Sequence, residues 1–144
     1  MRISYAAAVT AIAFSGCMTP SQPGMDGGVA TTIQVESGHE FEIAVNQEAR
    51  LTGTSLSIRF RGVSNDSRCP SDVKCVWAGN AVARFTLAVS GKSNLDASLN
   101  TTLDPKMVQY AGFTVTLKGL KPVPKSGSSI PSADYVAVLE VAAN

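Results

Sequence analysis

The feature that most restricts the fold is the alternation of apolar and polar residues after position 29. Leu56, Ile58 and Phe60, for example, alternate with polar neighbours. A period of two is typical of an extended strand, whereas a helix has a period near 3.6. No window after residue 29 shows a convincing helical period. Alternating segments lie at 31–35, 41–45, 55–61, 84–89, 95–100, 113–118 and 135–141, and a short strand near 49–51 adds an eighth.

Turn-forming residues separate these segments, as at Ser37, Gly38 and Gly53. Seven to eight short antiparallel strands with turns between them predict an all-β fold, a small β-sandwich of immunoglobulin-like or similar type. Hydrophobic residues make up 44% of the 144 positions, which is sufficient for one core. A chain of this length holds one domain, and we place it at residues 29–144.

Three segments depart from the simple pattern. Residues 104–110 could hold one helical turn. Residues 121–131 contain several prolines, which lack the N–H donor that a central strand needs, so we expect a long exposed loop there. The last strand, 135–141, also carries valine at positions 136 and 138, which suggests burial on both faces.

The N-terminus has the pattern of an export signal. Arg2 precedes an apolar run, 3–14, that is too short to cross a bilayer as a permanent helix. The run leads into Ser15-Gly16-Cys17, which resembles a lipobox, although phenylalanine stands where leucine is most common. We expect residues 1–16 to be a lipoprotein signal peptide and Cys17 to carry diacylglycerol and a palmitate-type chain, since two chains anchor stably. The alternative is an ordinary signal peptide with a chance cysteine.

Residues 17–28 predict a flexible tether, because Pro, Gly and Ser dominate and no apolar period is present. A tether of this length reaches about 20 Å from the lipid. Met18 follows the lipidated cysteine, where aspartate would retain the protein in the inner membrane. We therefore expect the protein in the cell envelope, on the outer membrane facing the periplasm if the organism has two membranes.

The three cysteines fit this location. If Cys17 is lipidated, Cys69 and Cys75 remain as a pair, and an oxidising compartment favours a disulfide between them. Their short separation excludes an immunoglobulin-type disulfide, which links two sheets and needs far more intervening chain.

The densest motif, 66–80, holds both of these cysteines and the only tryptophan. One interpretation is structural: a stapled connection in which Trp77 packs beside the disulfide and closes one end of the core. The other is functional, because loops on rigid scaffolds often carry function. It predicts a presented recognition loop whose contact residues are Arg68, Asp72, Lys74 and Trp77. Asp66 and Arg68 could pair with each other or with the loop backbone.

Residues 66–79 read Asp-Ser-Arg-Cys-Pro, four residues, then Cys-x-Trp-Ala-Gly. This pattern resembles a motif of small β-rich exported proteins and lipoproteins of bacteria, a group for which we know no activity. The resemblance implies export and a structural disulfide, and it implies no biochemical function.

Charge and chemistry exclude several functions. Of 12 basic residues, Arg2 lies in the signal peptide, and the remaining 11 balance 11 acidic residues, so no basic field for nucleic acid arises. An enzyme would need a general base, and the only histidine that could serve is His39. His39 stands at the start of a predicted strand, where a histidine is usually a surface residue. Glu40, Glu42 and Glu48 occupy polar strand positions. No ligand cluster predicts a metal site, and we expect no cofactor and no catalytic residue.

The favoured function is non-enzymatic: a binding or structural accessory module of the envelope. Its expected partners are the membrane, through the lipid, and a protein of the envelope. One alternative is an inhibitor of an envelope-directed hydrolase such as a lysozyme or protease, with 69–75 or 121–131 as the protruding loop. The other is an enzyme that uses His39.

Overall fold

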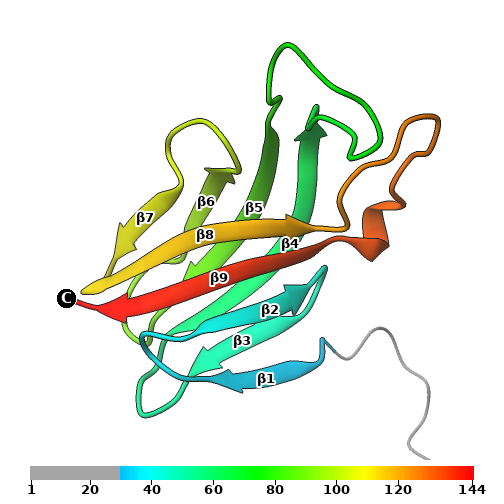
Figure 1. Cartoon of the computed structure of the whole chain (residues 1–144). Coiled ribbons are helices and arrows are strands. Elements are labelled where there is room, and N and C mark those ends of the chain that lie inside the picture. The colour runs from blue at the N-terminus through cyan, green and yellow to red at the C-terminus, as the bar shows by residue number, and fades with distance from the viewer. Residues whose placement is uncertain (1–29) are drawn as a thin grey trace, which may run out of the picture.

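The computed structural model describes residues 30–144 and shows two sheets of β-strands facing each other (Figure 1). This range contains nine strands and one 3-10 helix, η1 (Ser132–Asp134). The strands are β1 (Thr32–Val35), β2 (Glu40–Ala44), β3 (Glu48–Leu51), β4 (Ser57–Asp66), β5 (Ala81–Ala88), β6 (Leu95–Asn100), β7 (Met107–Tyr110), β8 (Phe113–Lys121) and β9 (Val136–Ala143). The predicted signal peptide, 1–16, and the tether, 17–28, lie outside the described residues.

The strands form a β-sandwich, as the sequence predicts. One sheet has the order β1-β3-β4-β5-β6 and the other has the order β2-β9-β8-β7. Every neighbouring pair is antiparallel except β1 and β3, which are parallel. The exception arises because β2 lies between them in the chain but belongs to the other sheet. The chain reverses into β2 and reverses again into β3, so β1 and β3 run the same way.

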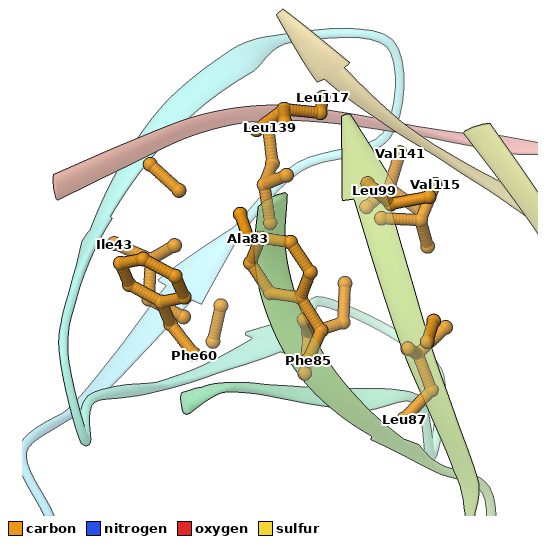
Figure 2. Packing of buried hydrophobic residues seen from close by; sticks show 14 of the residues in the cluster. Ile43, Phe60, Ala83, Phe85, Leu87, Leu99, Val115, Leu117, Leu139 and Val141 are labelled. Carbon is orange, nitrogen blue, oxygen red and sulfur yellow. The ribbon is translucent and has the colours of Figure 1, made fainter. Parts of the chain in front are cut away.

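The core lies between the sheets and is built from the alternating apolar positions. Phe60 of β4 and Phe85 of β5 are each no more than 1% exposed, and their rings stack with centroids 5.1 Å apart (Figure 2). The opposite sheet contributes Val115, Leu117, Leu139 and Val141 to the same cluster. Within residues 30–144 no buried side chain is polar or charged. Burial of apolar surface therefore accounts for the stability of the sandwich body.

The helical turn considered for 104–110 is wrong. Residues 107–110 form β7, which pairs with β8 in the register Met107 to Thr116 through Tyr110 to Phe113. In this strand Val108 and Tyr110 are half-buried and pack against the core, whereas Met107 is exposed. The open edge of β8 offers backbone hydrogen bonds that an isolated helical turn cannot match.

The C-terminal part agrees with the remaining expectations. β8 ends at Lys121, and 122–131 form an irregular, largely exposed loop before η1. In β9, Val136 and Val138 are half-buried, while the intervening residues point into the core. In the described range no helix has the length and apolar character needed to cross a membrane.

Three loops gather at one end of the sandwich, which we call the loop end. β4 and β6 are both antiparallel to β5, so the loops 67–80 and 101–106 emerge together. Loop 122–131, which follows β8, extends toward loop 67–80 (Figure 1).

Candidate binding site at the loop end

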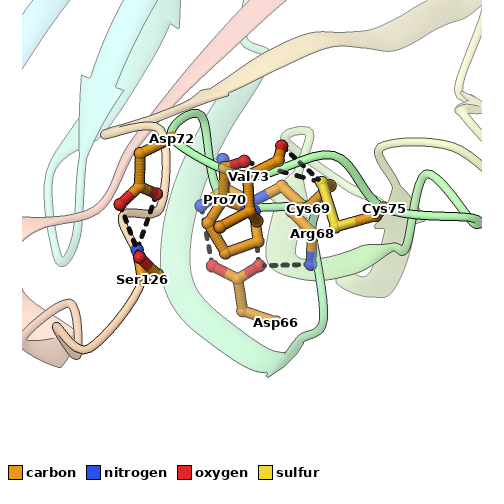
Figure 3. Close-up of a disulfide and its surroundings, with 8 residues drawn as sticks. All are labelled: Asp66, Arg68, Cys69, Pro70, Asp72, Val73, Cys75 and Ser126. Atoms are coloured by element: carbon orange, nitrogen blue, oxygen red, sulfur yellow. Dashed lines mark hydrogen bonds and ion pairs between the residues drawn. A yellow bond between two sulfur atoms is a disulfide. The ribbon is translucent and has the colours of Figure 1, made fainter.

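The loop 67–80, which we call the stapled loop, is closed by a covalent bond. Cys69 and Cys75 form the expected disulfide, with their Cα atoms 5.9 Å apart (Figure 3). Two hydrogen bonds extend the β4–β5 ladder into the loop: Ser67 N–H donates to the Asn80 carbonyl at 2.7 Å, and Cys69 N–H donates to the Ala78 carbonyl at 3.1 Å. The ring of residues 69–75 therefore stands on a short two-stranded stem.

Gly79 is required where the stem begins. Its φ is +67°, a region that side-chain-bearing residues rarely adopt. A Cβ at this position would lie 1.8 Å from the Ser67 carbonyl oxygen. Only glycine lets the two strands of the stem approach this closely.

Arg68 anchors the stapled loop to the opposite sheet. Its Nε donates to Asp66 Oδ1 at 2.8 Å and its Nη2 to Asp66 Oδ2 at 2.7 Å, in a two-point ion pair. Nη1 and Nη2 also donate to the carbonyls of Leu120 and Pro122, at 2.6 and 3.0 Å. Both predicted modes are confirmed, because Asp66 Oδ1 also accepts a hydrogen bond from the backbone N–H of Arg68, within the loop, at 3.2 Å. The prediction of Arg68 as an exposed contact is wrong, because its side chain is only 11% exposed.

The surroundings of this pair fix its charge state. The Arg68 guanidinium beside Asp66 holds the pKa of that carboxyl below its ordinary value, against the opposing effect of burial. The Tyr135 hydroxyl donates to Asp66 Oδ2 at 3.0 Å. Burial, followed by the nearby Asp66 carboxylate, raises the pKa of Tyr135. The carboxylate is therefore ionised at neutral pH and receives hydrogen bonds from both neighbours.

Asp72 joins the stapled loop to loop 122–131. The backbone N–H of Ser126 donates to Asp72 Oδ1 at 2.8 Å, and the Ser126 hydroxyl donates to Oδ2 (Figure 3). Ser71 N–H donates to the Pro124 carbonyl at 2.9 Å. The hydrogen bonds from Ser126 lower the pKa of Asp72. Asp72 is exposed as expected, yet its oxygens already accept hydrogen bonds from Ser126, whereas the exposed Lys74 makes no ion pair among the described residues.

Asn80 joins the stapled loop to its other neighbour. Its Oδ1 accepts hydrogen bonds from the backbone N–H groups of Thr102 and Leu103, at 3.0 and 3.3 Å. Its Nδ2 donates to Asn100 Oδ1 at 2.7 Å. Polar side chains thus tie the three loops into one unit.

Trp77 does not lie in the core, so the structural interpretation of this residue is wrong. Its side chain is 81% exposed, and the neighbouring Val76 is 90% exposed. The loop between β4 and β5 extends beyond the ends of these strands (Figure 1). Tyr135, which is 8% exposed, and the Asp66–Arg68 pair lie below the loop, where Trp77 was expected to close the core.

Exposed apolar side chains concentrate at the loop end. In the described part of the chain, every large hydrophobic residue classed as exposed belongs to one of the three loops or to the first position of β7. They are Val73, Val76, Trp77, Leu103, Met107 and Val123. We call the first three, which all lie on the stapled loop, the apolar tip. Val73 and Val76 were not among the predicted site residues, although an apolar pair beside tryptophan in a polar loop was visible in the sequence.

His39 lies far from the loop end. It is exposed, and its Nδ1 lies 3.2 Å from the Ser37 carbonyl in the turn before β2. That turn contacts Val141 near the end of β9, whereas loop 122–131 precedes the start of β9. Glu40 and Glu42 pair with Lys118 and Lys121.

Glu48 pairs with Arg50 and Arg59, and these hydrogen bonds, that to Arg50 foremost, lower its pKa. Within residues 30–144 no three His, Cys, Asp or Glu side chains gather as a potential metal site. The acidic and imidazole groups are therefore dispersed over the strands rather than collected around a cleft.

The outer face of the five-stranded sheet has a shallow depression of about 480 Å³, lined by polar residues that include Arg61, Arg84 and Asp96. It contains no histidine or cysteine. Asp96 accepts a hydrogen bond from Thr86 at 2.7 Å. The depression has the features of an ordinary solvated strand face, and the loop end remains the more distinctive surface.

Comparison with protein-family models, with curated protein sequences and with solved structures finds no match to this chain. The structure brings together four of the predicted site residues: Arg68, Asp72, Lys74 and Trp77 lie on the stapled loop. Of these, Lys74 and Trp77 are exposed and form no side-chain hydrogen bond or ion pair within residues 30–144, Asp72 is exposed but bonded to Ser126, and Arg68 is an internal anchor.

Proposed function

We propose that this chain is a lipid-anchored, non-enzymatic binding module of the cell envelope and that the loop end is its contact surface. The observation that carries the proposal is the gathering of exposed apolar side chains at the loop end: five lie on three loops that polar bonds tie together, and the sixth, Met107, begins β7. Exposed apolar patches on soluble domains mark interaction sites. A preformed loop loses little conformational entropy on binding.

The envelope location rests on the sequence. The apolar run 3–14, the lipobox-like Ser15-Gly16-Cys17 and the resemblance of residues 66–79 to exported bacterial proteins all support it. The disulfide supports folding in an oxidising compartment. Mass spectrometry of the protein isolated from cells tests this part. We expect an N-terminus at an acylated Cys17, and an unmodified Met1 terminus would refute it.

A photoreactive amino acid at position 76, introduced in living cells, tests the contact surface. Val76 is 90% exposed and makes no core contact, so the substitution leaves the fold intact. We expect an adduct at this position, whether with a protein or with a lipid. The matched control places the same residue at Lys92, an exposed turn position between β5 and β6 at the opposite end. Equal labelling at both positions, or none at position 76, would contradict the proposal.

A second candidate is inhibition of an envelope-directed hydrolase. One observation favours it: the two loops expected to protrude, 69–75 and 121–131, are joined by Asp72 and Ser126 into a single projection. Inhibitors insert such rigid projections into clefts. Adding the purified protein to a lysozyme and to proteases tests this candidate, and a loss of hydrolysis that Trp77→Ala relieves would support it.

The third candidate, an enzyme using His39, predicts a loss of function in His39→Ala. We propose no catalysis at this residue, because its imidazole contacts only a backbone carbonyl and lies away from the loop end. An unchanged cellular phenotype of the variant would remove the enzymatic alternative.

A further inference from the structure

We infer that the apolar tip inserts into the interfacial layer of the lipid bilayer to which the chain is anchored. The inference rests on the proposed function, since it names the partner of the same loop end. It gives the domain two membrane contacts: the expected lipid on Cys17 and the side chains of Val73, Val76 and Trp77.

The side chains of the tip match the boundary between headgroups and acyl chains. Val76 and Trp77 are 90% and 81% exposed, and Val73 is 45% exposed. Tryptophan has an apolar body and an N–H donor, and it is enriched at this boundary for that reason. Lys74, within the same ring, can keep its ammonium at the level of the phosphates while its stem lies along the apolar layer.

The backbone of the loop suits shallow insertion. Entry into a water-poor layer is costly for backbone groups that lack partners. The stem uses its own groups internally, through Ser67 with Asn80 and Cys69 with Ala78. At the ring, Val73 N–H donates to the Pro70 carbonyl and Ser71 N–H donates to the Pro124 carbonyl. Residues 74–77 make no backbone hydrogen bond among the described residues, so insertion is limited to the interfacial layer, about 5–10 Å deep, where headgroups and water can bond to them.

Strand directions place the start of β1 toward the side of the tip. Thr32, at the start of β1, pairs with Glu48, and Glu48 pairs with Arg59 of β4. Because β1 is antiparallel to β4, its start points toward the end at which β4 leads into the stapled loop. Arg59 and Asp66 are seven positions apart on β4, which is about 23 Å at 3.3 Å per residue.

The chain between Cys17 and β1 is long enough to connect both contacts. The 12 residues from 18 to 29 reach roughly 40 Å when fully extended. This length exceeds the distance of about 23 Å along β4 between Arg59 and Asp66. The remainder can span the distance by which the stapled loop extends beyond β4. A lipid on Cys17 and the apolar tip can therefore meet the same bilayer.

The size of the tip favours a membrane over a protein partner. A stable protein interface buries about 800 Å² on each side, whereas the one tryptophan of the tip offers about 150–250 Å² and its two valines are smaller. A contact this small becomes effective when a second attachment holds it close to its target. The lipid anchor supplies that attachment for the membrane, and it supplies none for a diffusing protein.

Trp77 is the only tryptophan of the chain, so its fluorescence reports on the tip alone. The full protein isolated from cells would be reconstituted into vesicles of phosphatidylethanolamine and phosphatidylglycerol with brominated acyl chains. We expect a shift of the Trp77 emission to shorter wavelength and quenching by bromine near the headgroups. The double variant Val73→Ser/Val76→Ser should lose most of this quenching.

A matched control moves the tryptophan to the other end of the domain. In Trp77→Ala/Lys92→Trp the new indole lies on the β5–β6 turn, and we expect neither a shift nor quenching. Equal emission from position 77 and position 92 in vesicle-bound protein would overturn the inference. So would quenching at position 77 that survives the double valine variant.

The chemical identity of the adduct at position 76 separates this inference from the proposed function. A lipid adduct supports both. An adduct with another protein, or with a second copy of this chain, overturns the membrane inference and leaves the binding module standing. No adduct at position 76 overturns both.

Discussion

The sandwich body and the stapled loop distribute polarity in opposite ways. In the body, alternating strands turn Ile58, Phe60 and Phe85 inward and leave no polar side chain buried among the described residues. In the loop, the charged Arg68 points inward to the opposite sheet, while Val76 and Trp77 point outward. Apolar side chains are therefore buried in the body, where they stabilise the fold, and are left exposed on the loop.

The difference shows two sources of order. The body is held by apolar burial, which is non-directional and large in sum. The loop is held by one disulfide and a few directional bonds, so its apolar side chains need not serve its structure. An apolar residue without a structural task is available to a partner.

The largest expected effect lies in the body. Phe60→Ala removes a fully buried ring stacked on Phe85, and such truncations cost about 3–5 kcal/mol. Urea unfolding should show a lower midpoint with an unchanged slope. A cost below about 1 kcal/mol would mean that the packing between the sheets is looser than the structure shows.

Arg68→Ala tests the polar anchor of the loop. It leaves the half-buried Asp66 carboxylate and two backbone carbonyls without their donor, which we expect to cost about 2–3 kcal/mol. The control is Arg84→Ala, an exposed arginine on β5, which should change the free energy of unfolding by less than about 0.5 kcal/mol. Equal changes in the free energy of unfolding for the two variants would mean that Arg68 stabilises the protein no more than an exposed surface arginine does.

Removal of the disulfide sharpens the comparison further. The double variant Cys69→Ala/Cys75→Ala opens a ring with a sequence separation of 6, and the loop-entropy relation gives about 2 kcal/mol. Because the loop extends beyond the ends of β4 and β5, the near-ultraviolet signals of the buried aromatic residues should persist below the melting temperature. Their loss would show that the staple supports the core as well as the loop.

Acid should weaken the anchor before it weakens the core. The folded-state pKa of Asp66 is lowered, chiefly by its bonds to Arg68. The pair therefore contributes stability above the unfolded-state pKa, near 3.9, and this contribution is lost as pH falls through the lower folded-state value. Chemical unfolding between pH 5 and pH 2 measures the loss, which should be smaller in Asp66→Asn, where no proton is taken up at this position.

The smallest effect on stability is expected at the tip. Trp77→Ala removes an exposed side chain without a core contact, so the free energy of unfolding should change by less than about 0.5 kcal/mol. The matched variant Phe85→Ala, which also truncates an aromatic residue, should be strongly destabilising. A large loss in Trp77→Ala would mean that the tryptophan supports the loop after all.

The sequence predicts most of the body, because strand periodicity is a local signal. The segments around Ile58, Phe85 and Leu117 carry it clearly, and the structure confirms each. The strand 107–110 was missed because four residues before a turn are too short to show a period. Its formation depends on the free edge of β8, which is distant in sequence until the fold brings it close.

Within the stapled loop the sequence predicts the disulfide bond but not which side chains point inward. The pairing of Cys69 with Cys75 follows from counting only if Cys17 is set aside for the expected lipid, and the structure confirms the pair. Whether Arg68 or Trp77 points inward depends on Leu120, Pro122 and Tyr135, which are more than 40 positions away in the chain. Average residue preferences favour buried tryptophan and exposed arginine, and here both preferences are reversed.

The narrow stem at Gly79 has a consequence for protein engineering. The frame of the stapled loop depends on Gly79, the disulfide and the Asp66–Arg68 pair, while positions 73, 74, 76 and 77 project from it without internal contacts that fix their identity. The loop is thus a natural display scaffold. Libraries randomised at those four positions would keep the same backbone conformation. Variants that bind new targets could be selected from them.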